Sequence, residues 1–504
     1  MKNENFFIKK ANARKLRRFQ ENSALAFGTG ASAALGAVCI LMSFDFKTLA
    51  FKVGVPMMIG GLFMAEAVLC FLIWQAMKSQ VLKKGDISRG LRLTGILLFA
   101  TIVNGNIFCS LAGLSLMKKK KKLEYQVGSY MLLVEILIII VSYLNVFKPY
   151  VCDSFFMGMG ILAAVIIIHA ISLPLVCVGV KGNRADKKML PVAIVLIATT
   201  ATGNIFSLLL GLMLIRKVYT KDDHVSIAWV DVVKRLFRSQ MAALGAFIIV
   251  FLMALSVCAH LTFEYSIAID NNYSMILNAP SLAYPFGTDD YGRCIFTRVV
   301  FGARISLIVG IASTAISIVV GVVLGAIAGF YSGTIDNSIM RVLDVFMAIP
   351  GLLLPIAIIT AFGTNTANIT LALGVGAIPG YSRTIRASVM TLADAEFVEA
   401  ARACGAKDRT IIFKHILPNS MAPLIIRATL GIGAGVTAVS SLSYLGLGIA
   451  PHIPEWGNIL KAGSSFLETN PYMAIFPGMA IVVLVLAFNF LGDGLRDALD
   501  PKLK

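Results

Sequence analysis

A long series of apolar stretches, each about the length of a membrane-spanning helix, constrains this chain of 504 residues more than any other feature. Hydrophobic residues make up 58% of the chain and charged residues only 14%. A helix needs ~20 residues to cross the hydrocarbon core of a bilayer, and the backbone must satisfy its hydrogen bonds internally there. Long unbroken apolar runs indicate helices rather than the alternating strands of a barrel. We therefore predict an all-α integral membrane protein in the cell membrane.

The formal charge of +18 does not indicate a nucleic-acid partner. Lys and Arg lie in short loops between the apolar stretches, as the positive-inside rule expects, and no basic segment interleaved with aromatic residues occurs. The eight cysteines are scattered without a CxxC pair, and the five histidines are isolated, so we expect no metal site. No G-x-x-x-x-G-K-[ST] loop or nucleophile–base set is present. We expect that the chain is not an enzyme, that membrane lipid surrounds it and that it binds no cofactor itself.

The first half of the chain contains an internal repeat. The segments NGNIFCSLAGLSLMKK (104–119) and TGNIFSLLLGLMLIRK (202–217) are identical at nine of sixteen positions and lie 98 residues apart. Each segment closes a set of three apolar stretches, so residues 1–220 form a duplicated three-segment unit, about 20–119 and 125–217. The six stretches are 24–44, 53–77, 91–117, 129–147, 155–180 and 189–215.

The topology of this region has two interpretations. If every stretch crosses the membrane, the second copy is inverted relative to the first, and Lys118–Lys122 lie outside, against the positive-inside rule. Alternatively, 91–117 and 189–215 are re-entrant and bend at 104–106 and 202–204, where Gly and Asn favour a turn. Both interpretations give an even number of crossings. The basic N-terminus precedes a stretch too long for a signal peptide, so we expect an uncleaved anchor with the N-terminus inside.

Three ionisable residues, Glu66, Glu135 and His169, lie within these apolar stretches. Such residues predict either a functional role, for example a proton relay, or a polar contact to a neighbouring helix. Both hypotheses stay open.

Residues 221–240 form a predicted boundary. The segment SIAWVDVVKRLFRSQ has one apolar stripe and several basic residues, which indicates an amphipathic helix on the inner membrane surface or a soluble linker helix. Residues 241–504 then contain six predicted spans, at 241–262, 305–330, 338–361, 369–385, 420–446 and 472–494. Pro350 and Pro379 are expected to kink the third and fourth of them. Because the second half begins inside, the polar loop at 386–418 and the C-terminus fall on the cytoplasmic face.

The stretch 391–418 (the 391–418 loop) is the longest polar interruption in this half. Phe397, Ala400, Ala401 and Cys404 have the i, i+3, i+4, i+7 spacing of one helix face, with two charged residues off that face, Glu399 and Arg402. A second short helix is expected after a glycine stop and an acidic cap, ending at a proline: Gly405, Asp408 and Pro418.

Here the chain resembles a known family. Glu399-Ala400-Ala401, three residues, Gly405, and then Leu417-Pro418 are similar to the EAA loop of ABC-importer permeases. Two further segments, together with the HILPN form, resemble the dipeptide, oligopeptide and nickel branch, second-permease type: YPFGTDDYGRCIFTRVVFGARISL (284–307) and LGDGLRDALDP (491–501). The family has an aliphatic residue two places before the Leu-Pro, where this chain has His415. The resemblance covers about 239–504, and 1–220 is not recognised.

The resemblance implies a six-helix type I importer bundle that moves peptides by alternating access. It implies four partners: a second homologous permease, two ABC ATPase subunits that bind the ATP, and an external solute-binding protein. In the family this loop docks on an ATPase. Glu399 and Arg402 would supply polar contacts, and Phe397, Ala400 and Ala401 the docking face. Gly405 would set the bend and Pro418 the start of the fifth span, with Leu417 as a further coupling residue. Nickel or another small solute is the alternative cargo.

The loops at 263–304 and 447–471 are expected outside. Gly287-Thr288-Asp289 is typical of a turn, and Arg293, Arg298 and Arg304 can pair with Asp289 or Asp290. This signature is either a surface that meets a delivery protein or partner permease, or a packed approach to the second span. In the other loop, Trp456 is expected to be an interfacial anchor.

Two further hypotheses concern the whole chain. An ion-coupled secondary carrier or channel would use the intramembrane residues of the first half and need no ATPase. Alternatively, the first half is a non-transporting scaffold or sensor fused to a permease, and deleting 1–220 would leave uptake intact.

Overall fold

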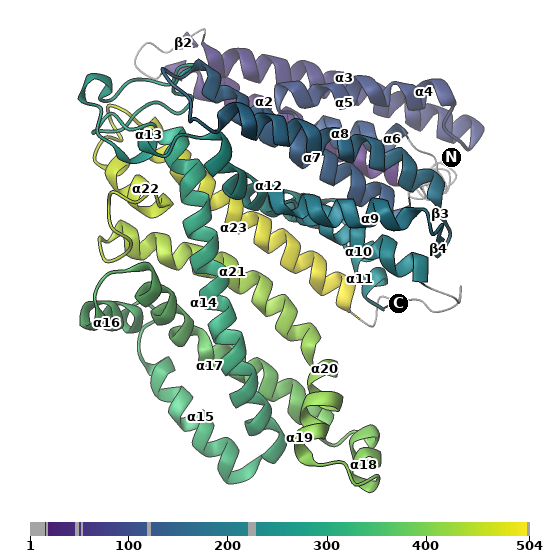
Figure 1. The fold of residues 1–504 in the computed structure, drawn as a ribbon, viewed down its shortest axis with the longest axis vertical. Coiled ribbons are helices and arrows are strands. Elements are labelled where there is room, and N and C mark those ends of the chain that lie inside the picture. Colours follow the sequence, from purple (N-terminus) through teal and green to yellow (C-terminus); the bar gives the residue numbers. More distant parts are fainter. Residues whose placement is uncertain are drawn as a thin grey trace, which may run out of the picture. The chain divides into compact units, whose positions relative to one another are not determined.

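A computed structural model describes residues 16, 19–45, 50–51, 54–117, 122–219 and 228–500 (Figure 1). The basic N-terminus and Lys118–Lys121 lie outside these residues. The chain divides into two compact units. The first comprises Met1–Ile140 with Leu162–Val225, and the second comprises Val141–Ile161 with Ser226–Lys504. The assignment of 1–220, 221–240 and 241–504 as functional domains stays a prediction.

The first unit holds most of the two repeat copies, while Val141–Ile161 of the second copy belongs to the second unit. The first copy begins with α2 (Gln20–Met42) and α3 (Val55–Lys84), joined through an antiparallel pair, β1 (Phe44–Asp45) and β2 (Ala50–Phe51). The second begins with α7 (Leu123–Tyr143), extended by η2 (Leu144–Phe147), and α8 (Phe155–Gly179), followed by β3 (Val180–Lys181) and β4 (Arg184–Ala185).

Each copy closes with a helical hairpin rather than a span. The first hairpin consists of α4 (Arg89–Leu93), α5 (Gly95–Ala100), η1 (Thr101–Asn104) and α6 (Ile107–Met117). The second consists of α9 (Met189–Ala198), η3 (Thr199–Thr202) and α10 (Ile205–Tyr219). The tips turn at Gly105 and Gly203, whose φ angles of 77° and 83° suit glycine.

The two arms of each hairpin touch. A Cβ on Gly95 would lie 2.6 Å from the carbonyl oxygen of Gly113, and one on Gly211 would lie 2.9 Å from that of Ala193. These two pairs are related by the same 98-residue offset as the sequence repeat. The structure therefore has the second of the two arrangements, in which 91–117 and 189–215 fold back on themselves.

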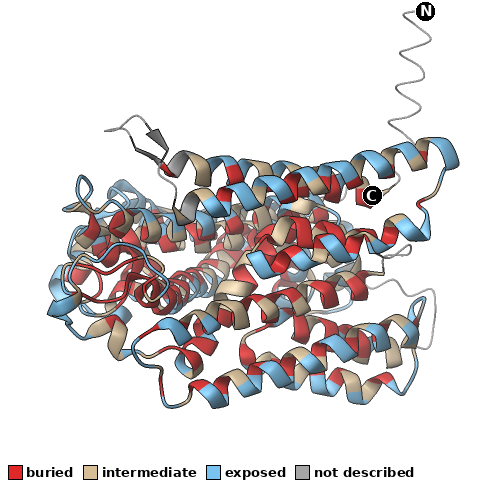
Figure 2. Ribbon diagram, turned by 90° about the horizontal axis from the view of Figure 1, so that it is seen from above, coloured by how far each residue is buried: buried red, intermediate tan, exposed pale blue. Residues whose placement is uncertain are grey.

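Among the described residues, eight helices are long and apolar enough to cross a membrane, or nine if one bent pair counts as a single span. Four lie in the first half (α2, α3, α7 and α8). The others are α12 (Gln240–Thr262), α14 (Ile295–Tyr331), α21 (Met421–Tyr444) and α23 (Tyr472–Leu499). Large apolar side chains are exposed on outward helix faces, for example Phe156 at 79% and Val178 at 76% (Figure 2). The all-α integral membrane fold is confirmed.

The second unit is a helical bundle built on two long pairs. α14 packs along α17 (Thr366–Ala393), and α12 packs along α23 (Figure 1). The amphipathic segment before α12 forms α11 (Ala228–Leu236), which packs on α23. The two loops predicted to lie outside form α13 (Ser266–Ile269), η4 (Tyr273–Met275) and α22 (Trp456–Ser464).

Two predicted spans differ from the structure. The stretch 338–361 is not one kinked helix, because α15 (Gly333–Ala348) and α16 (Leu353–Phe362) meet at 86° across a break that contains Pro350. Pro379, by contrast, stays inside the unbroken α17. α17 is long enough to cross a membrane but is less apolar than the eight spans. The second span begins at Ile295 rather than at residue 305.

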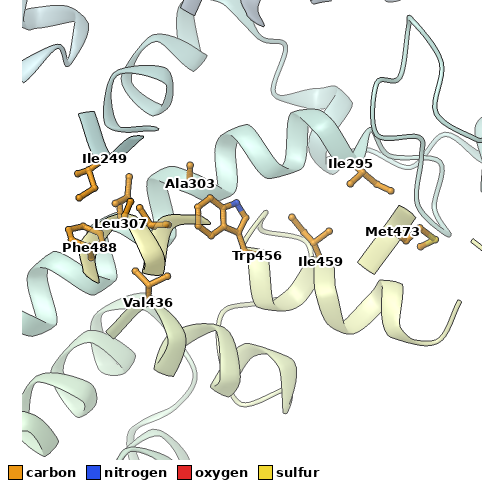
Figure 3. Close-up of a cluster of buried hydrophobic side chains, with 11 residues drawn as sticks. Ile249, Ile295, Ala303, Leu307, Val436, Trp456, Ile459, Met473 and Phe488 are labelled. Carbon is orange, nitrogen blue, oxygen red and sulfur yellow. The ribbon is translucent and has the colours of Figure 1, made fainter. Parts of the chain in front are cut away.

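Trp456 occupies the centre of the core rather than an interface. It is fully buried, and its indole N–H donates to the carbonyl of Val299 at 2.9 Å. Figure 3 shows the ring among side chains of α14, α21 and α23, including Leu307, Val436 and Phe488. The prediction of an interfacial anchor is wrong, because the loop after α21 folds back and inserts α22 into the bundle.

Candidate functional site

The 391–418 loop forms a projection at the end of α17, built from α18 (Glu396–Ala403), α19 (Asp408–Thr410), the π-helical turn η5 (Ile411–Ile416) and α20 (Leu417–Asn419) (Figure 1). α18 ends as the sequence predicts. Gly405 has a φ of 77°, and its N–H donates to the backbone carbonyl of Arg402 at 2.9 Å. The N–H of Ala406 donates to the backbone carbonyl of Ala401 at 3.0 Å. This pair of bonds is a Schellman motif, which favours glycine at the left-handed position.

The inner face of the projection is seated on a hydrophobic cluster. Val398 and Ile416 are fully buried and pack with Ile385 and Val389 of α17 and Phe330 of α14. Burying each such side chain stabilises the seat by roughly 1.5–3 kcal/mol. The projection is therefore fixed by packing to the ends of α14 and α17.

The outer face carries Phe397, which is 38% exposed, together with Ala400 and Cys404. Glu399 and Arg402 are also exposed, and the Arg402 guanidinium lies 5.5 Å from the centre of the Phe330 ring. Ala401 differs from the prediction: it packs against the inner cluster, because it shares the helix face of Val398.

The second half of the loop differs in detail from the expected helix. Asp408 is the first helical residue rather than the cap, a position that Lys407 occupies without a side-chain bond. Pro418 lies within α20, after the buried Leu417, and α21 begins only at Met421. Sequence periodicity did not indicate the π-helical turn, which exposes Phe413 to 56%. Short π-helical turns are rare and occur frequently at functional sites.

The outer signature residues are buried and build their own loop. Gly287 takes a φ of 75°, and the Thr288 hydroxyl accepts from the N–H of Asn278 at 2.8 Å. Asp289 is 2% exposed and accepts from the Nε and the N–H of Arg293, both at 2.8 Å. Arg298, also 2% exposed, lies 3.8 Å from Asp289 and donates to the carbonyl of Ala268 at 2.8 Å. These contacts favour the packed approach to α14 over an exposed docking surface.

Arg304 and Asp290 are the other charged residues of segment 284–307. Arg304 contacts the His260 ring instead of an aspartate. Burial, reinforced by the neighbouring Asp289, raises the pKa of Asp290.

Glu455 anchors the inserted α22. It is fully buried and caps the helix by accepting from the N–H of Asn458 at 3.1 Å. The hydroxyl of Ser440 donates to its other oxygen at 3.1 Å, and that of Ser306 does so at 3.4 Å. Burial raises the pKa of this carboxyl group.

The intramembrane residues of the first half contact the hairpin tips. Glu66 accepts from Asn104 at 2.8 Å and from Asn106 at 2.7 Å. Glu135 accepts from the Thr202 hydroxyl at 2.7 Å, and His169 Nε2 lies 3.0 Å from the Thr199 hydroxyl. These contacts favour a structural role, since each polar group holds a turn of its own repeat copy.

A cavity of about 820 Å³ opens in the second unit. Its walls come from α14, the α15–α16 break, α17 and α21, and Arg496 of α23 also lines it. Sequence reasoning did not identify these residues, because no motif marks them and only packing brings the four elements together.

Comparison with known proteins shows that this helical fold belongs to the membrane subunit of a transporter. Residues 321–504 match the family described as the inner membrane component of binding-protein-dependent transport systems, and this chain belongs to that family. It is 42% identical over 285 residues to the dipeptide transport system permease protein of Alkalihalophilus pseudofirmus, covering 56% of this chain and 93% of that relative. A glutathione transport system permease protein of Pectobacterium atrosepticum is 40% identical over 284 residues, covering 56% and 94%.

A solved structure of the MetNI methionine ABC transporter in an inward-facing conformation is also similar. It is 21% identical with a TM-score of 0.33, over 40% of this chain and 97% of that chain.

Proposed function

We propose that this chain is the permease subunit of an ATP-driven importer that takes up peptides. Its partners would be a second homologous permease, two ABC ATPase subunits and an external solute-binding protein. The identity to dipeptide and glutathione permeases supports the peptide cargo. Nickel or another small solute is the alternative within the same machinery.

The projection carries this proposal. It presents an exposed face of Phe397, Ala400 and Glu399, while its inner face is locked to α14 and α17 through Val398 and Ile416. A rigid projection with one free face transmits motion in a way that a flexible loop cannot.

The mechanism follows from this connectivity. When ATP closes the ATPase dimer, the projection moves with its ATPase, and α17 and α21, which flank it directly in the chain, reorient. The cavity between α14, α17 and α21 then opens to the other side of the membrane, because packed bundles switch between discrete arrangements. This proposal places the projection and both termini in the cytoplasm.

One observation in the first half favours the ion-coupled alternative. Both oxygens of Glu66 accept hydrogen bonds, but Oε2 of the fully buried Glu135 has no partner among the described residues. We retain the scaffold or sensor role for the first half, because the remaining contacts of these groups hold the hairpin tips.

Co-purification of the tagged chain in a gentle detergent tests the proposal. We expect two P-loop ATPases and a second permease to travel with it and ATP-dependent peptide uptake to survive deletion of 1–220. A chain that purifies alone, and moves solute down an ion gradient without ATPases, would establish the carrier instead.

A further inference from the structure

The cavity of the second unit contains an arginine. Arg427 lies in the membrane-spanning helix α21, lines the cavity and is exposed there. A charged side chain within a membrane span is costly unless it faces a partner, water or a ligand. Its guanidinium makes no ion pair within the part of the chain that the structure describes, and no Asp or Glu lines the cavity.

The surrounding backbone makes room for this guanidinium. A Cβ on Gly380 would lie 2.2 Å from Nη2 of Arg427, so any other residue there would displace it. The guanidinium lies 5.3 Å from the centre of the buried Tyr381 ring. The Tyr381 hydroxyl lies against Gly431, where a Cβ would lie 1.9 Å from the hydroxyl oxygen. Glycine at this position therefore leaves space for the Tyr381 side chain.

This arrangement leaves the hydrogen-bonding edge of the guanidinium available. The ring attracts the cation through its π-system, while the N–H groups lie in the guanidinium plane and match the two oxygens of a carboxylate. Ser313 and Thr384 also line the cavity, but their hydroxyls donate to the carbonyls of Gly310 and Gly380. Arg496 adds a second positive charge to the lining.

We propose that Arg427 forms an anion subsite in the cavity that binds the carboxylate of the transported solute, in a peptide its C-terminal carboxylate. This inference rests on the proposed function for the identity of the solute. The anion preference of the cavity itself does not depend on it.

The anion preference is measured first, in the full chain with its partners. Ala434→Cys introduces a thiol at an exposed position of the cavity wall, seven residues from Arg427 on the same helix, in a Cys404→Ser background. The rates at which an anionic and a cationic thiosulfonate reagent modify this thiol are measured, and their quotient is the anionic-to-cationic rate ratio. The chain without the new thiol gives the background rate. We expect Arg427→Gln to lower the anionic-to-cationic rate ratio by roughly five-fold, Arg427→Lys to preserve most of it, and the exposed Arg341→Gln to leave it unchanged. An unchanged ratio in Arg427→Gln overturns the proposal.

Uptake by the reconstituted transporter tests the solute. The uptake rates of Ala-Ala and of its C-terminal amide are compared, each at a concentration that saturates the binding protein. We expect the wild type to carry the free acid faster and Arg427→Gln to remove this preference, while Arg341→Gln keeps it. A free-acid preference that survives Arg427→Gln overturns the carboxylate assignment and leaves the importer intact. If the wild type takes up neither peptide when ATP is present, the proposed function is wrong. The thiol-modification rates then test by themselves whether the cavity contains an anion subsite.

Discussion

Asn106 donates from Nδ2 to Oε2 of Glu66 at 2.7 Å and so ties the tip of the first hairpin to α3. In the second copy the tip residue Asn204 instead lies 3.4 Å from Glu135 of α7, the first long helix of its copy. The duplicated units therefore keep the contact between a carboxylate and the hairpin tip but supply the carboxylate from different helices.

Glu66→Leu should destabilise the protein by about 1–3 kcal/mol, because the fully buried Asn106 amide would lose its acceptor. Thermal unfolding of the purified protein in detergent measures the effect. Glu66→Leu combined with Asn106→Leu should cost less than the sum of the single changes, since both remove the same bond. Additive losses, or an equal loss in the exposed control Glu468→Leu, would argue against this role.

Trp456→Ala should lower the free energy of unfolding by about 3–5 kcal/mol, because it empties the centre of the core around α22. Trp229, which is 60% exposed on α11, offers a matched control, and Trp229→Ala should change stability by less than about 0.5 kcal/mol. The two melting curves are compared at one pH. Equal shifts would contradict the buried position of Trp456.

Glu455 should make stability depend on pH. Burial raises its pKa in the folded state, so the folded protein holds this proton more tightly than the unfolded chain. The resulting stability is fully present below the ordinary pKa of a carboxyl group and is lost as the pH rises from there through the raised pKa. Holding the proton ten times more tightly in the folded state corresponds to about 1.4 kcal/mol of stability.

Glu455→Gln, which keeps an oxygen for the cap, should flatten the pH profile over this window. Melting temperatures of both proteins from mildly acidic to neutral pH provide the comparison. A parallel decline in the variant would assign the pH dependence to other groups.

Glu399→Lys should uncouple transport while the protein still inserts in the membrane, because it reverses an exposed charge on the outer face of the projection. We expect uptake to fall at least ten-fold and the ATPases to be lost on purification. Glu468→Lys, the same exchange in an exposed loop before α23, should leave both unchanged. Retention of ATPases and uptake in Glu399→Lys would remove this residue from the contact.

Gly405→Pro should have the same effect for a backbone reason. The left-handed φ of 77° is inaccessible to proline, whose ring fixes φ near −65°, so the Schellman turn cannot form. Uptake and membrane abundance are measured together. Normal uptake would mean that the turn is not needed for coupling.

The sequence predicted much of the projection because its signals are local. The spacing in α18 and the glycine after it determine a short helix and its end, wherever the helix is packed. The inward orientation of Ala401 and the π-helical turn that exposes Phe413 were not predictable in this way, since they depend on the cluster formed with α14 and α17.

By itself the sequence determined the helical membrane class, the repeat of the first half and the family motifs, because apolar length, turn residues and motif spacing are properties of the chain. Only the tertiary structure decided between crossing segments and hairpins, since the contact between Gly95 and Gly113 joins arms separated in sequence. Only packing moved Trp456 from a predicted interface to the core and placed Arg427 in a cavity between helices. Apolar character sets which residues leave water, but the neighbours they meet depend on how distant helices pack.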